Sequence, residues 1–289
     1  MAFDNMPDLG PMRLPGAPEY GAASVAGALK AAETVPHKLD IAYGDDPFQQ
    51  LDVWYPANAK GKLPVVVFIH GGAWRNGHKE WNGIMAPLIT GLPAILVSLN
   101  YRLVPKVKFP APVDDCFDGL AWIYRNIAQF GGDPDRLHIG GHSAGGHLAA
   151  MLALNRPALK QRGIPVEAIR LCSPVSGLYT FLKEDLTIEG VRTTFWDQMF
   201  ADEAAAAAAS CFQFTDDNRV PFHLIWGGAD LAELIPDNAR LAAIAAEKGF
   251  LLGVDVQPGL DHFGAHMDCL RPDSAYAVKL REVFARDSK

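Results

Sequence analysis

Apolar and polar residues alternate over residues 37–43 and again over 50–55, with Gly44, two aspartates and Pro47 between them. Alternation with a period of two is typical of strands with one covered face, and glycine, aspartate and proline favour a tight turn. The two segments therefore predict an antiparallel hairpin. Short, nearly continuous apolar runs follow at residues 64–70, 94–100, 137–140, 169–173, 222–226 and 252–257. Such runs predict strands covered on both faces, as parallel strands are.

Helix-length segments separate these strands. Residues 113–130 repeat apolar positions at a spacing of 3.6, and the glycines and proline of 131–134 end that segment. The apolar stripe consists of Cys116, Leu120, Ile123, Tyr124 and Ile127. Further helices are expected over residues 22–33, 143–155, 231–248 and from an N-cap at Asp273 to about residue 286. Strands that alternate with helices after an antiparallel start predict an α/β fold with an eight-stranded, mostly parallel sheet.

Two segments lie outside this alternation. Residues 1–36 are rich in proline, glycine and alanine and are expected to form an N-terminal arm over the body. Residues 178–215 carry several aromatic residues and an alanine run, which predicts a small inserted, cap-like helical segment. We therefore expect residues 1–289 to form a single domain.

Charge excludes two classes of partner. The chain has 26 Lys and Arg against 33 Asp and Glu, a formal net charge of −7, with 49% hydrophobic residues. An acidic globular protein binds nucleic acid and anionic membrane surfaces weakly, because the charges repel. We expect a small-molecule substrate, no nucleic-acid or membrane partner, and leave a homodimer open.

The four cysteines, Cys116, Cys172, Cys211 and Cys269, form no C-x-x-C pair, so they predict buried thiols in a reducing compartment rather than a zinc site. The first ten residues lack the basic and apolar regions of a signal peptide, and the apolar runs are strand-sized. The expected location is the cytoplasm.

The most informative motif is Gly141-His142-Ser143-Ala144-Gly145, which follows one apolar run and precedes a helix. This is G-x-S-x-G, in which a serine on a strained strand-to-helix turn raises its hydroxyl above the sheet. The following helix directs its amides and positive dipole end at charge that forms there. Ser143 is therefore the predicted nucleophile.

A glycine loop supports this prediction. The first parallel strand ends in His70-Gly71-Gly72-Ala73-Trp74. An acyl-transfer enzyme needs two backbone N–H donors for its oxyanion, one from the residue after the nucleophile and one from an earlier loop. The predicted donors are Ala144 and either Gly71 or Gly72.

The acid and the base should follow the serine in that order, each after a late strand. Asp230 follows the fifth of the six apolar runs and His262 follows the sixth, so these two residues are predicted to complete a triad with Ser143. Asp237 is the fallback acid, and Asp261 is a weaker candidate because it adjoins the proposed base.

The other histidines are weaker candidates for the base than His262. His142 is expected to pack beneath the turn, His147 to be structural, and His70 to brace the glycine loop. His266 stands four residues after His262, a spacing that also occurs in metal sites. Without an H-E-x-x-H motif, a solvated His266 and no metal or other cofactor are expected.

With these residues, the chain resembles an α/β-hydrolase of the esterase branch that includes hormone-sensitive-lipase-like enzymes, feruloyl-esterase-like enzymes and kynurenine formamidases. The resemblance covers almost everything from residue 38 onward. It rests on HGGAW at 70–74, NYRL at 100–103, FPA at 109–111, GDPDR at 132–136 and GHSAGGHL at 141–148. Residues 101–105 and 109–110 look like the lipase-like esterases, from whose pattern His142 and Ala73 depart. The GHSAG sequence and residues 174–179 and 230–233 look more like kynurenine formamidases.

The resemblance implies a serine hydrolase that cleaves a carboxylic ester or aryl formamide through an acyl-enzyme. An amidase, a carbamate hydrolase and a non-catalytic ligand-binding homologue are the alternatives. Trp74, Trp81 and Phe263 are the predicted substrate-binding residues, with Asn76 and His78 between the two tryptophans. Aromatic residues of the inserted segment are further candidates to close the entrance: Phe195, Trp196 and Phe200. The short insertion predicts small soluble substrates.

Overall fold

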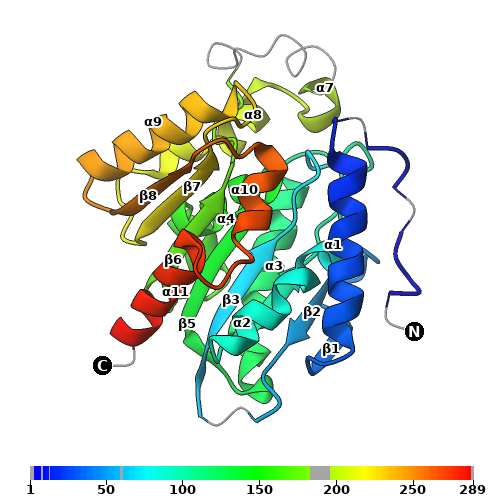
Figure 1. Cartoon of the computed structure of the whole chain (residues 1–289). Helices are drawn as coiled ribbons and strands as arrows, with labels where there is room; N and C mark the ends of the chain where they lie inside the picture. The colour runs from blue at the N-terminus through cyan, green and yellow to red at the C-terminus, as the bar shows by residue number, and fades with distance from the viewer. Residues whose placement is uncertain (1–2, 8, 13, 59–60, 183–195, 288–289) are drawn as a thin grey trace.

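The computed structural model describes residues 3–7, 9–12, 14–58, 61–182 and 196–287. One eight-stranded sheet has the order β1-β2-β4-β3-β5-β6-β7-β8 (Figure 1). Its strands are β1 (His37–Ala42), β2 (Gln50–Trp54), β3 (Leu63–Ile69), β4 (Ile95–Leu99), β5 (Gly132–His142), β6 (Ile169–Val175), β7 (Phe222–Gly227) and β8 (Leu251–Gln257). β2 pairs antiparallel with both β1 and β4, and the remaining pairs are parallel. The predicted hairpin and the mostly parallel sheet are confirmed.

Helices cover both faces of the sheet. One hydrophobic cluster packs α3 (Ala111–Asn126), α4 (Ala144–Leu154) and α9 (Leu234–Glu247) against the strands. A second cluster, on the face toward the viewer in Figure 1, involves α1 (Ala17–Ala32), α2 (Ala86–Gly91), α10 (His262–Asp268) and α11 (Ala275–Arg286). β3, β4, β6 and β7 are buried on both faces, which explains their continuous apolar runs. The same prediction was wrong for β8, an edge strand on which Leu252, Val254 and Val256 are exposed.

Some predicted boundaries were wrong. α1 begins at Ala17 rather than residue 22, and β5 begins at Gly132 because its first residues already pair beside β3. The last helix is capped by Ser274, whose hydroxyl accepts from the N–H of Ala277 at 3.1 Å. Asp273 instead pairs with Arg271.

The sheet register brings the carboxyl ends of the parallel strands to one edge. Ile69 of β3 lies beside Gly141 of β5, and His142 lies beside Val175 of β6. At the other side, Gly227 of β7 pairs with Gln257 of β8. The loops after β3, β5, β6, β7 and β8 therefore open at the same edge, where ligands bind in open α/β sheets.

The N-terminal arm and the inserted segment flank this edge. α1 lies against the 3₁₀ helix η1 (Lys79–Met85), so closely that a Cβ on Gly83 would come within 2.8 Å of the Ala28 methyl group. The described part of the inserted segment forms α7 (Trp196–Met199), α8 (Glu203–Ala209) and η4 (Cys211–Phe214), with α7 and α8 at the upper end in Figure 1. α8, which contains the alanine run, begins after Asp202, whose side chain accepts from the N–H of Ala205 at 2.8 Å.

Candidate active site

Ser143 occupies a strained turn between β5 and α4. Its backbone angles are φ 57° and ψ −119°, and its N–H donates to the Val175 carbonyl at 2.8 Å. The flanking glycines make this turn possible, because a Cβ on Gly145 would lie 2.0 Å from the Ile69 carbonyl oxygen. A Cβ on Gly141 would lie 2.3 Å from the carbonyl oxygen of Gly145. The G-x-S-x-G spacing therefore reflects close approach of backbone to backbone.

The glycine loop after β3 passes beside this serine. A Cβ on Gly71 would lie 3.1 Å from the Cβ of Ser143, so the loop and the turn are in contact. Gly72 has φ 112°, and a Cβ there would lie 2.1 Å from the carbonyl oxygen of Asn76. Both positions require glycine.

His70 braces the glycine loop, as expected. Its Nδ1 donates to the Gly71 carbonyl at 2.8 Å. Burial lowers the pKa of His70 to about 3, so the imidazole stays neutral near pH 7. Its ring stacks on Tyr101, whose hydroxyl donates to the His70 carbonyl at 3.2 Å.

Asp230 and His262 meet across the loops after β7 and β8. Nδ1 of His262 lies 2.8 Å from Oδ1 of Asp230, and both residues are buried. Burial alone would raise the pKa of Asp230, but the hydrogen bonds from His262 and Ser176 and the charge of His262 hold that pKa below its usual value. The carboxylate therefore stays ionised, and the Nδ1–H of His262 points at it.

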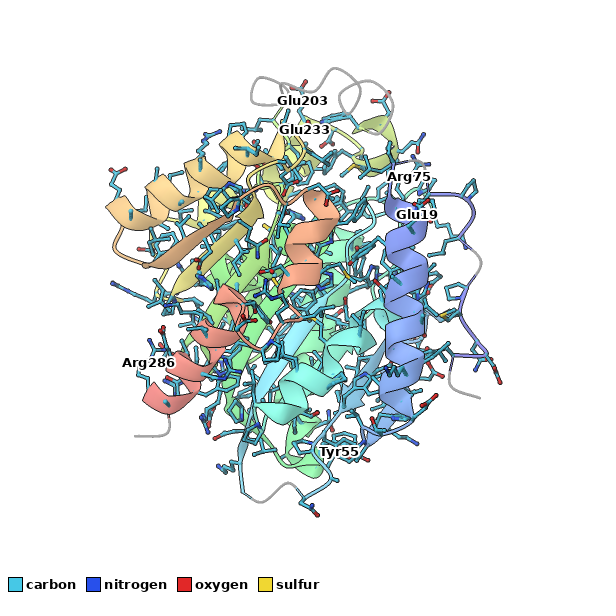
Figure 2. The ribbon with its side chains drawn as sticks, viewed as in Figure 1. Glu19, Tyr55, Arg75, Glu203, Glu233 and Arg286 are labelled. Carbon is cyan, nitrogen blue, oxygen red and sulfur yellow. The ribbon has the colours of Figure 1, made fainter. Side chains whose placement is uncertain are left out.

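A cavity of about 680 Å³ opens above this pair. Ser143 and His262 line it together with Gly72 and Ala73 of the glycine loop. Figure 2 shows Arg75 and Glu233, which also line the cavity, at the upper end of the molecule, whereas Tyr55 lies at the lower end. The cavity thus lies at the carboxyl edge of the sheet.

The predicted aromatic residues divide into two groups. Trp81 and Phe263 line the cavity. Trp74 is not among the described lining residues, because its ring packs into the core against Phe109 and Phe181, at centroid distances of 6.1 and 5.2 Å. The prediction that Trp74 contacts substrate is thus not supported by its position.

The candidates from the inserted segment have similar outcomes. Trp196 and Phe200 are buried and pack on each other at 5.5 Å, and neither lines the described cavity. Phe195 lies outside the described residues. Of the two polar candidates, Asn76 lines the cavity, whereas buried His78 hydrogen-bonds Glu80 at 3.0 Å.

The rival histidines have structural partners. His142 is buried and its Nε2 donates to the His262 carbonyl at 2.8 Å, but it also lines the cavity and does not lie wholly beneath the turn as predicted. His147 contacts the Ala209 carbonyl at 2.8 Å and accepts from the indole of Trp74. The prediction of a solvated His266 was wrong, because this side chain is fully buried and shares a 2.8 Å hydrogen bond with the Tyr20 hydroxyl.

The rival acids are also engaged elsewhere. Asp237 accepts from the backbone N–H of Tyr179, and Asp261 caps α10 by accepting from the N–H of Gly264 at 2.7 Å. Within the described ranges, no group of three or more His, Cys, Asp or Glu residues is arranged to hold a metal ion. No described helix is long and apolar enough to cross a membrane.

All four cysteines are free and buried, as expected from their spacing. Burial raises the pKa of each thiol, including that of Cys172 on β6. These residues therefore act as small apolar side chains.

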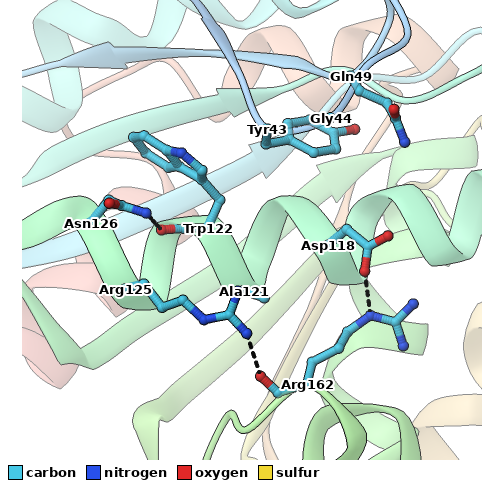
Figure 3. Close-up of a pocket in the computed structure, with 9 residues that line it drawn as sticks. All are labelled: Tyr43, Gly44, Gln49, Asp118, Ala121, Trp122, Arg125, Asn126 and Arg162. Atoms are coloured by element: carbon cyan, nitrogen blue, oxygen red, sulfur yellow. Dashed lines mark hydrogen bonds and ion pairs between the residues drawn. The ribbon is translucent and has the colours of Figure 1, made fainter.

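A second cavity, of about 280 Å³, lies between the β1–β2 hairpin and α3 (Figure 3). Both of its arginines are paired within the lining. Arg162 donates to Asp118 at 2.7 Å, and Arg125 donates to the Arg162 carbonyl at 3.1 Å. This cavity contains none of the predicted catalytic residues.

Sequence reasoning missed the contribution of the N-terminal arm to the cavity. Lining residues from the arm and the start of α1 are Leu9, Pro11, Met12, Leu14, Pro15, Ala17 and Tyr20. The ring of Tyr20 stacks on Phe263 at 4.8 Å. Apolar residues spaced among prolines were the available signal, but nothing in the sequence says where such a segment packs.

The arrangement of the sheet, the strained serine turn and the aspartate–histidine pair define the chain as an α/β-hydrolase. The BD-FAE family model matches residues 51–239, and the chain belongs to this family of α/β-hydrolase esterases.

Individual proteins are similar over different extents. Carboxylesterase NlhH of Mycobacterium tuberculosis is 33% identical over 244 residues, which cover 78% of this chain and 74% of that protein. Isoprenylcysteine alpha-carbonyl methylesterase ICME of Arabidopsis thaliana is 36% identical over 150 residues, 50% of this chain and 35% of that protein. The chain thus matches about a third of the length of this plant relative.

Solved structures share the fold. Esterase B of Lactobacillus rhamnosis superposes with a TM-score of 0.73 at 22% identity, with 93% of each chain covered. A putative thioesterase of Silicibacter sp. TM1040 gives a TM-score of 0.76 at 21% identity, covering 94% of this chain and 95% of that one.

Proposed function

We propose that this protein is a serine esterase that cleaves a carboxylic ester, or an aryl formamide, of a small substrate. The observation that carries the proposal is the 2.8 Å contact between His262 Nδ1 and Asp230 Oδ1, at the cavity that Ser143 also lines. The names of the relatives, a carboxylesterase and a methylesterase, agree with ester chemistry.

In the first half of the proposed reaction, Ser143 attacks the carbonyl carbon. Because Nδ1–H of His262 is held by Asp230, Nε2 is the free ring nitrogen and accepts the serine proton. The resulting tetrahedral oxyanion collapses, the bond to the leaving group breaks, and His262 returns the proton to the departing alcohol or amine. An acyl-enzyme on Ser143 remains.

In the second half, water displaces Ser143 from the acyl group. The water oxygen attacks the acyl carbon while His262 takes a proton from the water. The bond between the acyl carbon and Oγ of Ser143 then breaks, the acid leaves, and His262 returns its proton to Oγ. Every reacting group other than water and substrate comes from this chain, so the proposal requires no cofactor and no partner.

Backbone N–H groups are proposed to stabilise both oxyanions. Ala144 starts α4, where helix amides are free of intrahelical partners, and the loop that holds Gly71 and Gly72 contacts Ser143 at Gly71. One such donor contributes roughly 3–4 kcal/mol of transition-state stabilisation.

The cavity supports a small, mostly apolar substrate. Its volume of about 680 Å³ accommodates a short acyl chain or one aromatic group, and Trp81 and Phe263 offer flat apolar surfaces. The Gly-His-Ser-Ala-Gly sequence at 141–145 favours the aryl formamide alternative, whereas the named relatives favour the ester.

Comparing hydrolysis rates tests the proposal. We expect p-nitrophenyl acetate and butyrate to be hydrolysed by the wild type, and the His262→Ala and Asp230→Asn variants to lose about 10³-fold or more of kcat. N-formylkynurenine assayed beside them decides between ester and formamide. Wild-type turnover of none of these substrates, or full activity in His262→Ala, would contradict the proposal.

A further inference from the structure

Ser176, the residue after β6, contacts the proposed catalytic carboxylate. Its side chain is fully buried, and its hydroxyl donates to Oδ2 of Asp230. Ser176 itself lies 54 positions before Asp230 in the chain, so the contact depends on the pairing of β6 with β7.

The backbone of Ser176 is held in an unfavourable conformation. Its φ of 53° lies in the left-handed region, and its N–H donates to the Ile225 carbonyl of β7 at 2.8 Å. The next residue, Gly177, accepts from the Asn238 amide of α9 at 2.8 Å. Glycine would adopt this φ without strain, so a serine here points to a use for its hydroxyl.

That use follows from the hydrogen bonds of Asp230. Oδ1 accepts from His262 at 2.8 Å and from the N–H of Leu231 at 2.7 Å. Oδ2 accepts from the hydroxyl of Ser176 and, over a long 3.4 Å, from the N–H of Gly227. Without the Ser176 hydroxyl, Oδ2 of Asp230 would keep only the long hydrogen bond from Gly227. A buried carboxylate oxygen with one weak donor favours rotation or protonation of the Asp230 carboxylate.

We propose that Ser176 is a positioning residue that fixes the carboxylate plane of Asp230, so that Oδ1 remains directed at Nδ1 of His262. The proposal rests on the proposed function, because the aligned imidazole matters for proton transfer with Ser143. Ser176 is not among the described residues that line the cavity, so it acts on the reaction through Asp230.

Asp230 is the titratable group that the Ser176 hydroxyl contacts directly. His142 packs against the His262 ring at 4.6 Å from β5, and burial keeps its pKa well below the ordinary value, so it remains neutral. Loss of the Ser176 hydroxyl removes a donor that stabilises the charged carboxylate. The pKa of Asp230 then rises, and the acidic limb of the activity profile moves to higher pH.

The test uses Ser176→Gly, Ser176→Ala and a matched control, Ser173→Ala. Glycine removes the hydroxyl and relieves the backbone strain, which protects the fold. Ser173 lies on β6, just before Ser176 in the chain, and is also buried, but its hydroxyl has no partner among the described residues. The profile of kcat and KM for p-nitrophenyl butyrate is measured between pH 5 and 9 for each purified protein.

Both Ser176 variants are expected to lose about 10-fold of kcat with little change in KM, and to shift the acidic limb upward by about 0.5 pH units. The Ser173→Ala protein should match the wild type in both respects. A Ser176→Gly protein with wild-type kcat and an unshifted acidic limb would overturn the proposal.

A second readout does not depend on turnover. In ¹H NMR, the downfield resonance of the His262 Nδ1–H should move or broaden in Ser176→Gly and stay unchanged in Ser173→Ala. An unchanged resonance in Ser176→Gly overturns the positioning role even if no tested ester is hydrolysed. Absence of turnover in the wild type would instead count against the proposed function.

Discussion

The hydroxyl of Tyr20 on α1 lies 2.8 Å from Nδ1 of His266 on α10, the short helix that begins with His262. The same phenol ring stacks on Phe263 and meets the edge of Trp81 at 5.6 Å. One residue of the N-terminal arm is therefore packed against the helix that carries the proposed base and against two cavity walls.

Two substitutions of Tyr20 distinguish its hydrogen bond to His266 from the packing of its ring. Tyr20→Phe should keep the ring packing and lower the free energy of unfolding by about 1–2 kcal/mol, because a buried hydrogen bond to His266 is lost. Tyr20→Ala should lower it by about 3–5 kcal/mol and also raise KM for esters, since a cavity wall is removed. Urea unfolding and steady-state kinetics measure both effects. Equal stability of the two variants would contradict the packing described.

Trp81 and Trp74 should respond differently to substitution. Trp81→Phe puts a smaller ring in the wall of the cavity. We therefore expect the ratio of kcat/KM for the acetate ester to kcat/KM for the butyrate ester to change by about 3-fold or more. Trp74→Phe should leave that ratio close to the wild-type value, because the Trp74 indole packs in the core and donates to His147 at 3.2 Å. A larger change in Trp74→Phe than in Trp81→Phe would restore Trp74 as the substrate-contacting residue.

The positions of the strands and of the triad candidates could be predicted from sequence because each depends on local pattern. The buried strands appear as apolar runs, and Ser143 stands between glycines that the turn requires. Asp230 and His262 follow from chain order at strand ends.

The remaining features depend on packing between distant segments. The burial of His266 requires Tyr20, 246 positions earlier in the chain, and the use of Ser176 requires Asp230. Trp74 follows the glycine loop directly in the sequence, yet positive φ values at Ala73 and Trp74 accompany a turn into the core. The spacing of residues along the chain does not predict such contacts.

Gly145→Ala should prevent the serine turn from closing. A methyl group at this position would lie 2.0 Å from the Ile69 carbonyl oxygen and 2.6 Å from that of His70. We expect poor soluble expression or loss of about 3 kcal/mol or more of stability together with activity. Gly91→Ala is the control, because nothing lies within 4 Å of a Cβ there. Wild-type stability and activity in Gly145→Ala would contradict the geometry of the turn.

The buried histidines should make the protein sensitive to acid. Burial lowers the pKa of His138 to about 3 and that of His266 to about 4, so these side chains stay neutral in the fold while unfolded histidine protonates near pH 6.5. The unfolded state therefore binds more protons below pH 6.5, and stability falls as pH drops toward 4.

His138→Leu tests this origin of acid sensitivity away from the active site. His138 packs on Phe284 at 4.7 Å, far from the cavity lining. The variant should lose less stability than the wild type between pH 7.5 and 5, by up to about 2 kcal/mol, as measured by urea unfolding at each pH. An identical loss in both proteins would show that His138 does not contribute.

The central claim is that Ser143 is the nucleophile activated by His262 and Asp230. Incubation with a fluorophosphonate, digestion and mass spectrometry locate the covalent adduct directly. We expect a single stoichiometric adduct on Ser143 in the wild type and strongly slowed labelling in His262→Ala. An adduct on a different residue, or labelling of Ser143 at the same rate without His262, would contradict it.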